Sequence, residues 1–277
     1  MALAADYTRV EQRTKASAII GASIGVSFAL ALVLGPVLAA WGGLSRVFET
    51  TAILGGLGLL VVVFWLPPTP EISEAGRSHI ADRERLGEAL WGRGLGALYG
   101  SIFCLHLLLM AAFTAIPSVM INEVALPPEQ HAWMYLITLM GALPGVAILV
   151  RMHRHMADPR GLIAVAILLT VAGLVVALWS LSAWTLGLGL VLFFAGFTAL
   201  ETILPALVSI FAPTTLRGTA MGIFSSAQFL GVFAGGALGG NALYWGGYEG
   251  LVTAVLGLTL LWLLGLWRFS YAPVSTT

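Results

Sequence analysis

Residues 161–212 form an almost uncharged stretch in which Glu201 is the single charged side chain. About 20 apolar residues in a helix cross a bilayer at a rise of about 1.5 Å per residue, so this stretch is roughly twice too long for one crossing. We divide it at Ser182-Ala183-Trp184. Lipid offers the backbone no hydrogen-bonding partners, so each half is expected to be a helix. The stretch therefore predicts an all-α polytopic membrane protein.

The composition of the whole chain agrees with a membrane-spanning helical bundle. Hydrophobic residues make up 59% and charged residues 9% of its 277 residues, against roughly 45–50% and 25% in soluble domains. A transmembrane barrel would alternate apolar and polar residues in segments of about ten, whereas the apolar runs here are continuous. The formal net charge is zero and Cys104 is the only cysteine. We therefore expect no nucleic-acid surface, no disulfide framework and no Cys-based metal site.

Eight transmembrane helices are predicted from the apolar runs. They cover residues 16–41, 47–66, 94–121, 132–150, 161–181, 185–211, 219–242 and 249–267. Lys and Arg gather on the cytoplasmic side of membrane proteins, and with eight crossings only Arg46 of the 13 Lys and Arg residues falls on the other side. The side that carries the remaining cations is therefore expected to be cytoplasmic. An even number of crossings places both termini there.

An internal repeat relates the beginning of the chain to its end. An offset of about 204 residues aligns Arg13 with Arg217 and Gly35 with Gly239. The offset contains six predicted helices and residues 67–93, a segment of prolines and mixed charges that we interpret as a cytoplasmic linker. Parallel repeats of six helices are an arrangement that secondary transporters use. The repeat therefore favours a transporter.

Several motifs of this repeat resemble transporters of the major facilitator superfamily. Residues 13–36, with Gly35-Pro36, resemble their fifth helix and its antiporter motif, and residues 217–231 resemble their eleventh helix. Residues 104–110 and 201–205 make the chain most similar to the YajR-type proton-coupled drug antiporters. The resemblance implies a multi-pass protein of the bacterial inner membrane that exports a small amphiphilic or drug-like molecule in exchange for protons.

The resemblance also implies which helices are present. A complete member has twelve helices, and this chain resembles the fifth to the twelfth, so it looks like an N-terminally truncated copy that lacks a four-helix segment. Residues 1–66 would then be a two-helix remnant of the N-terminal six-helix bundle, residues 67–93 the linker, and residues 94–277 the C-terminal six-helix bundle. The alternative is a non-transporting membrane subunit, or an inactive remnant, that packs against a partner chain.

Two titratable side chains stand at similar depths in their predicted helices. Glu201 lies roughly 14 Å and His106 roughly 18 Å into the membrane at the usual helical rise. A carboxylate at mid-bilayer costs at least about 2.5–3.5 kcal/mol and is seldom kept without a partner or a proton to carry. A histidine can titrate near neutral pH. Both residues are candidates for proton coupling, against the alternative that each is a hydrogen-bonded packing residue.

Four further polar or charged residues are candidates with a simpler alternative. Gln228 and Tyr135 could bind substrate or a proton, but polar groups also join helices within membranes. Arg13 and Arg217 resemble residues of the family's conformational motifs. An arginine at a cytoplasmic helix start is also explained by the charge rule alone.

Two proline positions could mark places where a helix changes shape. Gly35-Pro36 could kink a helix and form a close contact that seals one side of a transporter, although small residues are also common in ordinary membrane packing. Pro205 removes a hydrogen bond from the turn that contains Glu201. Broken helices often mark transport sites.

Enzyme chemistry is not predicted. Gly21-Ala22-Ser23-Ile24-Gly25 matches a hydrolase nucleophile pattern, but that motif needs a strand-to-helix turn. His153-Arg154-His155 could bind a metal, but Arg154 repels cations and no carboxylate or cysteine cluster accompanies it. The chain has no Gly-x-x-x-x-Gly-Lys motif, so an ion gradient is the expected driver. We expect no cofactor or metal, and as partners a small-molecule substrate, protons and the lipid bilayer.

Overall fold

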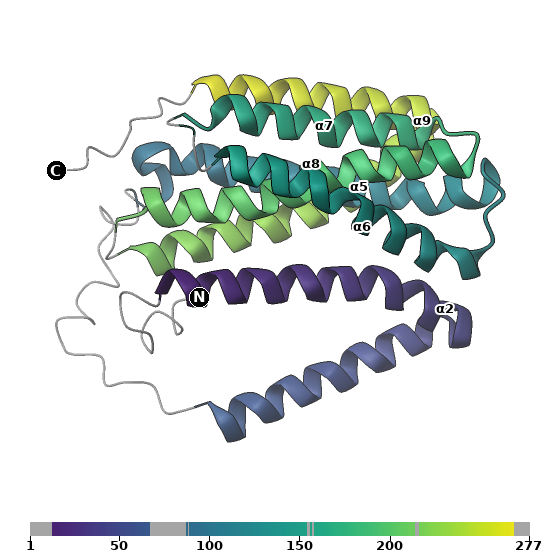
Figure 1. Cartoon of the computed structure of the whole chain (residues 1–277), viewed down its shortest axis with the longest axis horizontal. Coiled ribbons are helices and arrows are strands. Elements are labelled where there is room, and N and C mark those ends of the chain that lie inside the picture. The colour runs from purple at the N-terminus through teal and green to yellow at the C-terminus, as the bar shows by residue number, and fades with distance from the viewer. Residues whose placement is uncertain are drawn as a thin grey trace. The chain divides into compact units, whose positions relative to one another are not determined.

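The computed structural model describes residues 13–66, 87, 89–153, 156, 158–213 and 216–268. Within these ranges the regular elements are helices (Figure 1): α2 (Arg13–Trp65), the short 3-10 helix η2 (Gly92–Gly94), α5 (Leu95–Asn122), α6 (Pro128–His153), α7 (Arg160–Leu178), α8 (Ala183–Phe211) and α9 (Arg217–Arg268). Six of the described helices are long and apolar enough to cross a membrane. Most of the linker predicted for residues 67–93 lies outside the described residues.

Two helices contain a glycine break at which the chain reverses direction. The helix α2 has 53 residues and α9 has 52, which is roughly 80 Å each and well beyond the hydrocarbon core of about 30 Å. The break in α2 contains Gly43 with φ of +69°, and the break in α9 is at Gly247 with φ of +58°. Glycine adopts such left-handed conformations with the least strain. Figure 1 shows both helices folding back there, between segments that the sequence predicted as separate helices.

The long uncharged stretch is divided between α7 and α8. Trp179 ends α7, and Ser182 caps α8 by accepting a hydrogen bond from the Thr185 amide at 3.2 Å. Serine is a preferred residue at this position because its hydroxyl satisfies a free amide of the first turn. Ala183 and Trp184, which the sequence placed in the break, belong to the first turn of α8. The break therefore lies slightly earlier in the chain than predicted.

The chain forms two compact units. The smaller contains α2 and residues Pro128–Leu136 at the start of α6, and the larger contains η2, α5, the rest of α6 and α7 to α9. In the larger unit α5 packs most extensively against α9, and α7 against α8. Its core includes the fully buried side chains Leu105, Leu108, Phe193 and Phe194. The larger unit is thus a packed bundle around α5 and α8.

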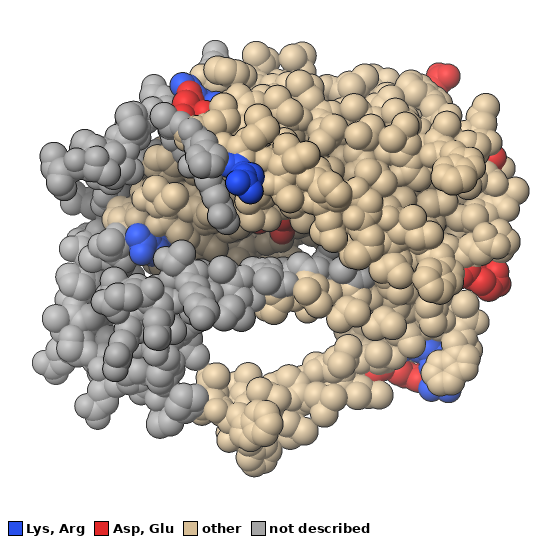
Figure 2. All heavy atoms as spheres, viewed as in Figure 1, with Lys and Arg blue, Asp and Glu red and all other residues tan. Residues whose placement is uncertain are grey.

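Charged side chains are sparse outside the helix ends. Lys, Arg, Asp and Glu are scattered over the face seen in Figure 2, and most of the visible atoms belong to other residues. In the smaller unit, none of the 18 most apolar consecutive residues in the Val33–Trp65 segment of α2 is buried. Such a surface is compatible with lipid, where exposed apolar side chains carry no cost.

Candidate functional site

Three predicted polar residues meet inside the larger unit. His106 comes from α5, Glu201 from α8 and Gln228 from α9. The His106 Nε2 atom lies 2.8 Å from Gln228 Nε2 and 3.5 Å from Glu201 Oε1. The sequence predicted these residues separately and did not predict that they meet. We call them the polar cluster.

A stripe of glycines explains how α9 brings Gln228 so close to α5. Gly231, Gly235 and Gly239 recur every four residues, which places them on one face of the helix. A Cβ atom on any of them would overlap α5, at Phe103, Leu107 and Ala111 respectively. Gln228 precedes Gly231 by one turn on the same face, and His106 lies next to Leu107. Close backbone contact through small residues, common between membrane helices, therefore sets the His106–Gln228 distance.

The imidazole of His106 is buried and held from two further sides. Its side chain is 7% exposed. The Nδ1 atom lies 3.2 Å from the backbone oxygen of Ile102, one turn earlier on α5. The ring also contacts the Phe197 ring of α8 edge-on, with 5.7 Å between the ring centroids, a favoured arrangement for aromatic pairs. These contacts fix the orientation of the ring.

Glu201 is the least satisfied member of the polar cluster. Its side chain is 25% exposed, and its buried Oε1 atom makes no hydrogen bond within the described part of the chain. Pro205 lies one turn later in the same helix and has no N–H to donate to the Glu201 carbonyl. A buried carboxyl oxygen without a hydrogen-bond partner is costly.

Aromatic side chains next to the polar cluster were missed by the sequence analysis. Phe197 stacks on Phe193, with 5.9 Å between the centroids, and Phe193 meets Phe194 edge-on. All three are at most 3% exposed. Phe197 precedes Glu201 by four residues, so helical spacing could have placed it on the same face. The aromatic rings give the polar cluster an apolar wall on α8.

The remaining polar candidates lie elsewhere in the chain. Tyr135 is buried on α6, in the part that belongs to the smaller unit. Arg217 is exposed at the first residue of α9. Arg13 is the first residue of α2, and its side chain lies outside what the structure describes. The structure does not test a role for these three residues.

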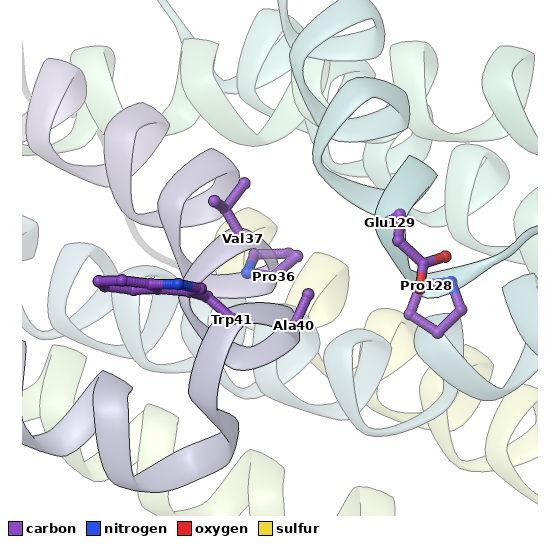
Figure 3. A pocket seen from close by; sticks show the side chains of 6 residues that line it. All are labelled: Pro36, Val37, Ala40, Trp41, Pro128 and Glu129. Carbon is purple, nitrogen blue, oxygen red and sulfur yellow. The ribbon is translucent and has the colours of Figure 1, made fainter.

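Pro36 lines a depression in the smaller unit, and Gly35-Pro36 lies before the main bend of α2. The helix continues through Pro36, and its non-helical residues are Gly42 and Gly43. The depression next to Pro36 has a volume of about 330 Å³. It is lined by Pro36, Val37, Ala40 and Trp41 from α2 and by Pro128 and Glu129 from the start of α6, the side chains labelled in Figure 3. A bend is made more easily by two glycines than by one proline, because glycine adopts positive φ.

The two patterns that suggested enzyme chemistry lie in or at the end of helices where they are described. Ser23 lies within α2, where the hydrolase motif would need a strand-to-helix turn. Of His153-Arg154-His155, only His153 is described. Within the described ranges, no group of three His, Cys, Asp or Glu side chains is arranged to hold a metal ion.

Long apolar helices around a buried polar cluster are typical of polytopic membrane proteins. The chain matches the sequence profile of the Major Facilitator Superfamily over residues 1–235. It is 36% identical over 274 residues to the inner membrane transport protein YajR of Escherichia coli (strain K12), covering 95% of this chain and 58% of that protein. The chain therefore belongs to the major facilitator superfamily, a family of transporters and not of enzymes.

Two further proteins agree with this assignment. An uncharacterized transporter of Buchnera aphidicola subsp. Acyrthosiphon pisum is 27% identical over 237 residues, which is 85% of this chain and 60% of that protein. The crystal structure of the human organic anion transporter MFSD10 shares the fold, with a TM-score of 0.67 and 21% identity over 96% of this chain and 66% of that one. The chain spans about three fifths of the length of both curated relatives.

Proposed function

We propose that the chain is part of a proton-coupled secondary transporter that exports a small amphiphilic or drug-like molecule. The observation that carries the proposal is the Glu201 carboxyl group, whose Oε1 lies 3.5 Å from His106 Nε2 and makes no hydrogen bond among the described residues. A transporter that uses a proton gradient needs a buried group that gains and loses a proton, and intramembrane carboxylates and histidines mark such relays. Glu201 would hold the proton, and His106 would be its nearest titratable neighbour.

The proposed membrane topology has eight crossings that correspond to helices five to twelve of the family. The glycine breaks in α2 and α9 support this count, because each helix is too long for one crossing. Residues 1–66 would form two helices of the N-terminal bundle, residues 67–93 the linker and residues 94–277 the C-terminal bundle. Both termini would be cytoplasmic, in a bacterial inner membrane. A four-helix segment, supplied from outside the 277 residues, would complete the N-terminal bundle.

Three motif positions would serve the conformational change. Pro36, which Gly35 precedes in the helix, lies beside a depression that the start of α6 also lines, which leaves room for α2 to move against α6. Pro205 weakens the hydrogen bonding of α8 next to Glu201. A proton on Glu201 could thus change the shape of α8 at the turn where Pro205 makes no backbone hydrogen bond.

Transport by membrane vesicles tests the proposal. Everted vesicles are prepared from cells that carry the gene at its own locus, so that native partner chains are present. A panel of fluorescent amphiphilic dyes should accumulate in response to an imposed pH gradient. Deletion of the gene and Glu201→Gln should both abolish this accumulation, whereas Glu249→Gln, an exposed carboxylate on α9, should retain it. Retained pH-driven accumulation after Glu201→Gln would refute the role of Glu201.

The second candidate function is a membrane subunit that does not transport alone but packs against a partner chain. The observation that favours it is α2, whose apolar segment Val33–Trp65 has none of its most apolar window buried. The same native vesicles separate the two. If Glu201→Gln abolishes dye transport while the protein stays in the membrane, the first proposal is supported; if deletion of the gene abolishes transport but Glu201→Gln does not, the second is supported.

A further inference from the structure

The hydrogen bonds of His106 define where its proton lies in the neutral state. The backbone oxygen of Ile102 can only accept a hydrogen bond, so Nδ1, at 3.2 Å, is the nitrogen that donates. In a neutral imidazole the other nitrogen, Nε2, then carries a lone pair and accepts. The side-chain amide nitrogen of Gln228, at 2.8 Å, supplies the matching donor. One arrangement of protons therefore satisfies the hydrogen bonding of the Ile102 oxygen, the His106 imidazole and the Gln228 amide nitrogen.

We propose that Gln228 is a positioning residue that keeps His106 in this state, and that its amide group must reverse or withdraw when His106 takes up a proton. The proposal deepens the proposed function, on which it rests for its role in transport. Gln228 acts here as a partner of His106, not as a substrate ligand. Gln228, the member of the polar cluster on α9, thus has a task distinct from those of His106 and Glu201.

Protonation of His106 changes the hydrogen-bonding role of one atom. The added proton goes to Nε2, which turns from an acceptor into a donor, while Nδ1 keeps its bond to Ile102. An amide N–H of Gln228 then faces an N–H, which is repulsive. The imidazole cannot turn away, since Ile102 and the Phe197 ring hold it. Gln228 must therefore present its carbonyl oxygen or withdraw.

Glu201 is the competing acceptor for the new N–H. Its Oε1 lies 3.5 Å from Nε2 and makes no hydrogen bond within the described residues. A small approach of α8 would convert this contact into a charge-assisted hydrogen bond, which is shorter and stronger than a neutral one. The protonated imidazole thus shifts its strongest bond from Gln228 on α9 to Glu201 on α8.

Few other ionisable groups on the packed helices could compete for the proton. Along α7 and α8 the only charged residues are Arg160, at the first residue of α7, and Glu201. The first arm of α9 has Arg217 at its start, about three turns from Gln228, and Tyr244 near its break. On α5 the nearest titratable neighbour is Cys104. The exchange therefore involves His106, Glu201 and Gln228.

Nitrogen NMR of His106 tests the proposal without a transport assay. The 277-residue chain is labelled with ¹⁵N-histidine, reconstituted in lipid bilayers, and its His106 signals are assigned by their loss in His106→Asn. In the wild type, neutral His106 should show a protonated Nδ1 and a bare, hydrogen-bonded Nε2. Gln228→Met, similar in size but without polar atoms, should shift the Nε2 signal to that of a nitrogen without a hydrogen bond. Gln228→Glu should produce a protonated Nε2 at neutral pH.

A control variant on the same helix separates this effect from a general disturbance of α9. Asn241 is exposed and its side chain donates only to the Ala237 oxygen among the described residues, so Asn241→Met should leave both His106 signals unchanged. A neutral wild-type His106 with its proton on Nε2 would overturn the proposal. So would a Gln228→Met spectrum that equals the wild type.

The vesicle experiment and the NMR experiment can fail independently. If Glu201→Gln leaves pH-driven transport intact while Gln228→Met shifts the Nε2 signal, the proposed function fails and Gln228 still positions His106. If transport depends on Glu201 but Gln228→Met leaves the His106 signals unchanged, the role of Gln228 fails by itself.

Discussion

The Val33–Trp65 segment of α2 and the helix α5 are similarly apolar but differ in how much of each is buried. In α5, 61% of the most apolar window is buried, and in the Val33–Trp65 segment of α2 none of it is. Both helices are long enough to cross a membrane, so apolar composition alone does not distinguish them. The difference lies in the partners, because the glycine stripe of α9 and the rings of Phe194 and Phe197 on α8 contact α5. Hydropathy thus indicates that a helix enters the membrane, and small residues at helical spacing indicate what it contacts there.

The largest effect that follows from this comparison concerns phenylalanines in the two regions. Phe193 on α8 is fully buried and Phe64 on α2 is 75% exposed. Phe193→Ala should lower the free energy of unfolding by about 3 kcal/mol, since it leaves a cavity in the packed bundle. Phe64→Ala should change it by less than about 0.5 kcal/mol. Unfolding titrations in mixed micelles measure both, and equal losses would contradict the contrast between α2 and the bundle.

The next effect tests the glycine stripe with two adjacent glycines. A Cβ on Gly235 would overlap the Leu107 backbone, whereas a Cβ on Gly236 would meet no atom within 4 Å. Gly235→Leu should therefore cost about 1–3 kcal/mol through overpacking. Gly236→Leu is the matched control and should keep the wild-type thermal midpoint in detergent. A Gly235→Leu protein as stable as the control would show that α9 does not pack on α5 through this face.

A smaller effect is expected at a hydrogen bond within the larger unit. The indole N–H of Trp262 on α9 donates to the buried Ser101 hydroxyl of α5 at 3.0 Å. Trp262→Phe removes this donor and should destabilise the chain by about 0.6–1 kcal/mol, as hydrogen bonds between membrane helices do. Trp245, which is 81% exposed, provides the control, and Trp245→Phe should have no measurable effect on the same unfolding titration.

The smallest effect is expected at an exposed ion pair. The Arg160 side chain donates to Asp158 at 2.7–3.0 Å, which holds the pKa of this carboxyl below its ordinary value. A lowered pKa stabilises the fold at neutral pH, and this contribution disappears as the pH falls through the lowered pKa. Asp158 is largely exposed, so Asp158→Asn should cost less than about 1 kcal/mol.

Thermal midpoints of the wild type and Asp158→Asn, compared from pH 7 downward, provide the measurement. The difference should shrink once the pH passes below the ordinary aspartate range near 3.8. A difference that grows with acidity would contradict the sign of this argument.

Much of the fold could be predicted from the sequence, because apolar runs between charged residues mark membrane helices directly. The break at residues 179–182 and the glycine bends at Gly43 and Gly247 lie within a few residues of their predicted places. That His106 and Glu201 lie well inside their helices was also predictable, since helical rise is constant. That they meet Gln228 was not, because their mutual distances depend on how α5, α8 and α9 are rotated about their axes. The spacing of Gly231, Gly235 and Gly239 was the available signal for that rotation.

The central claim is that Glu201 exchanges a proton inside the packed bundle. Infrared difference spectroscopy of the reconstituted chain measures this directly, through the carbonyl band of a protonated, buried carboxyl group. A stepwise change of pH should change the intensity of such a band, and the change should be absent in Glu201→Gln and present in Glu249→Gln. A band that Glu201→Gln leaves unaltered, or a wild type without any pH-dependent carboxyl band, would contradict the account.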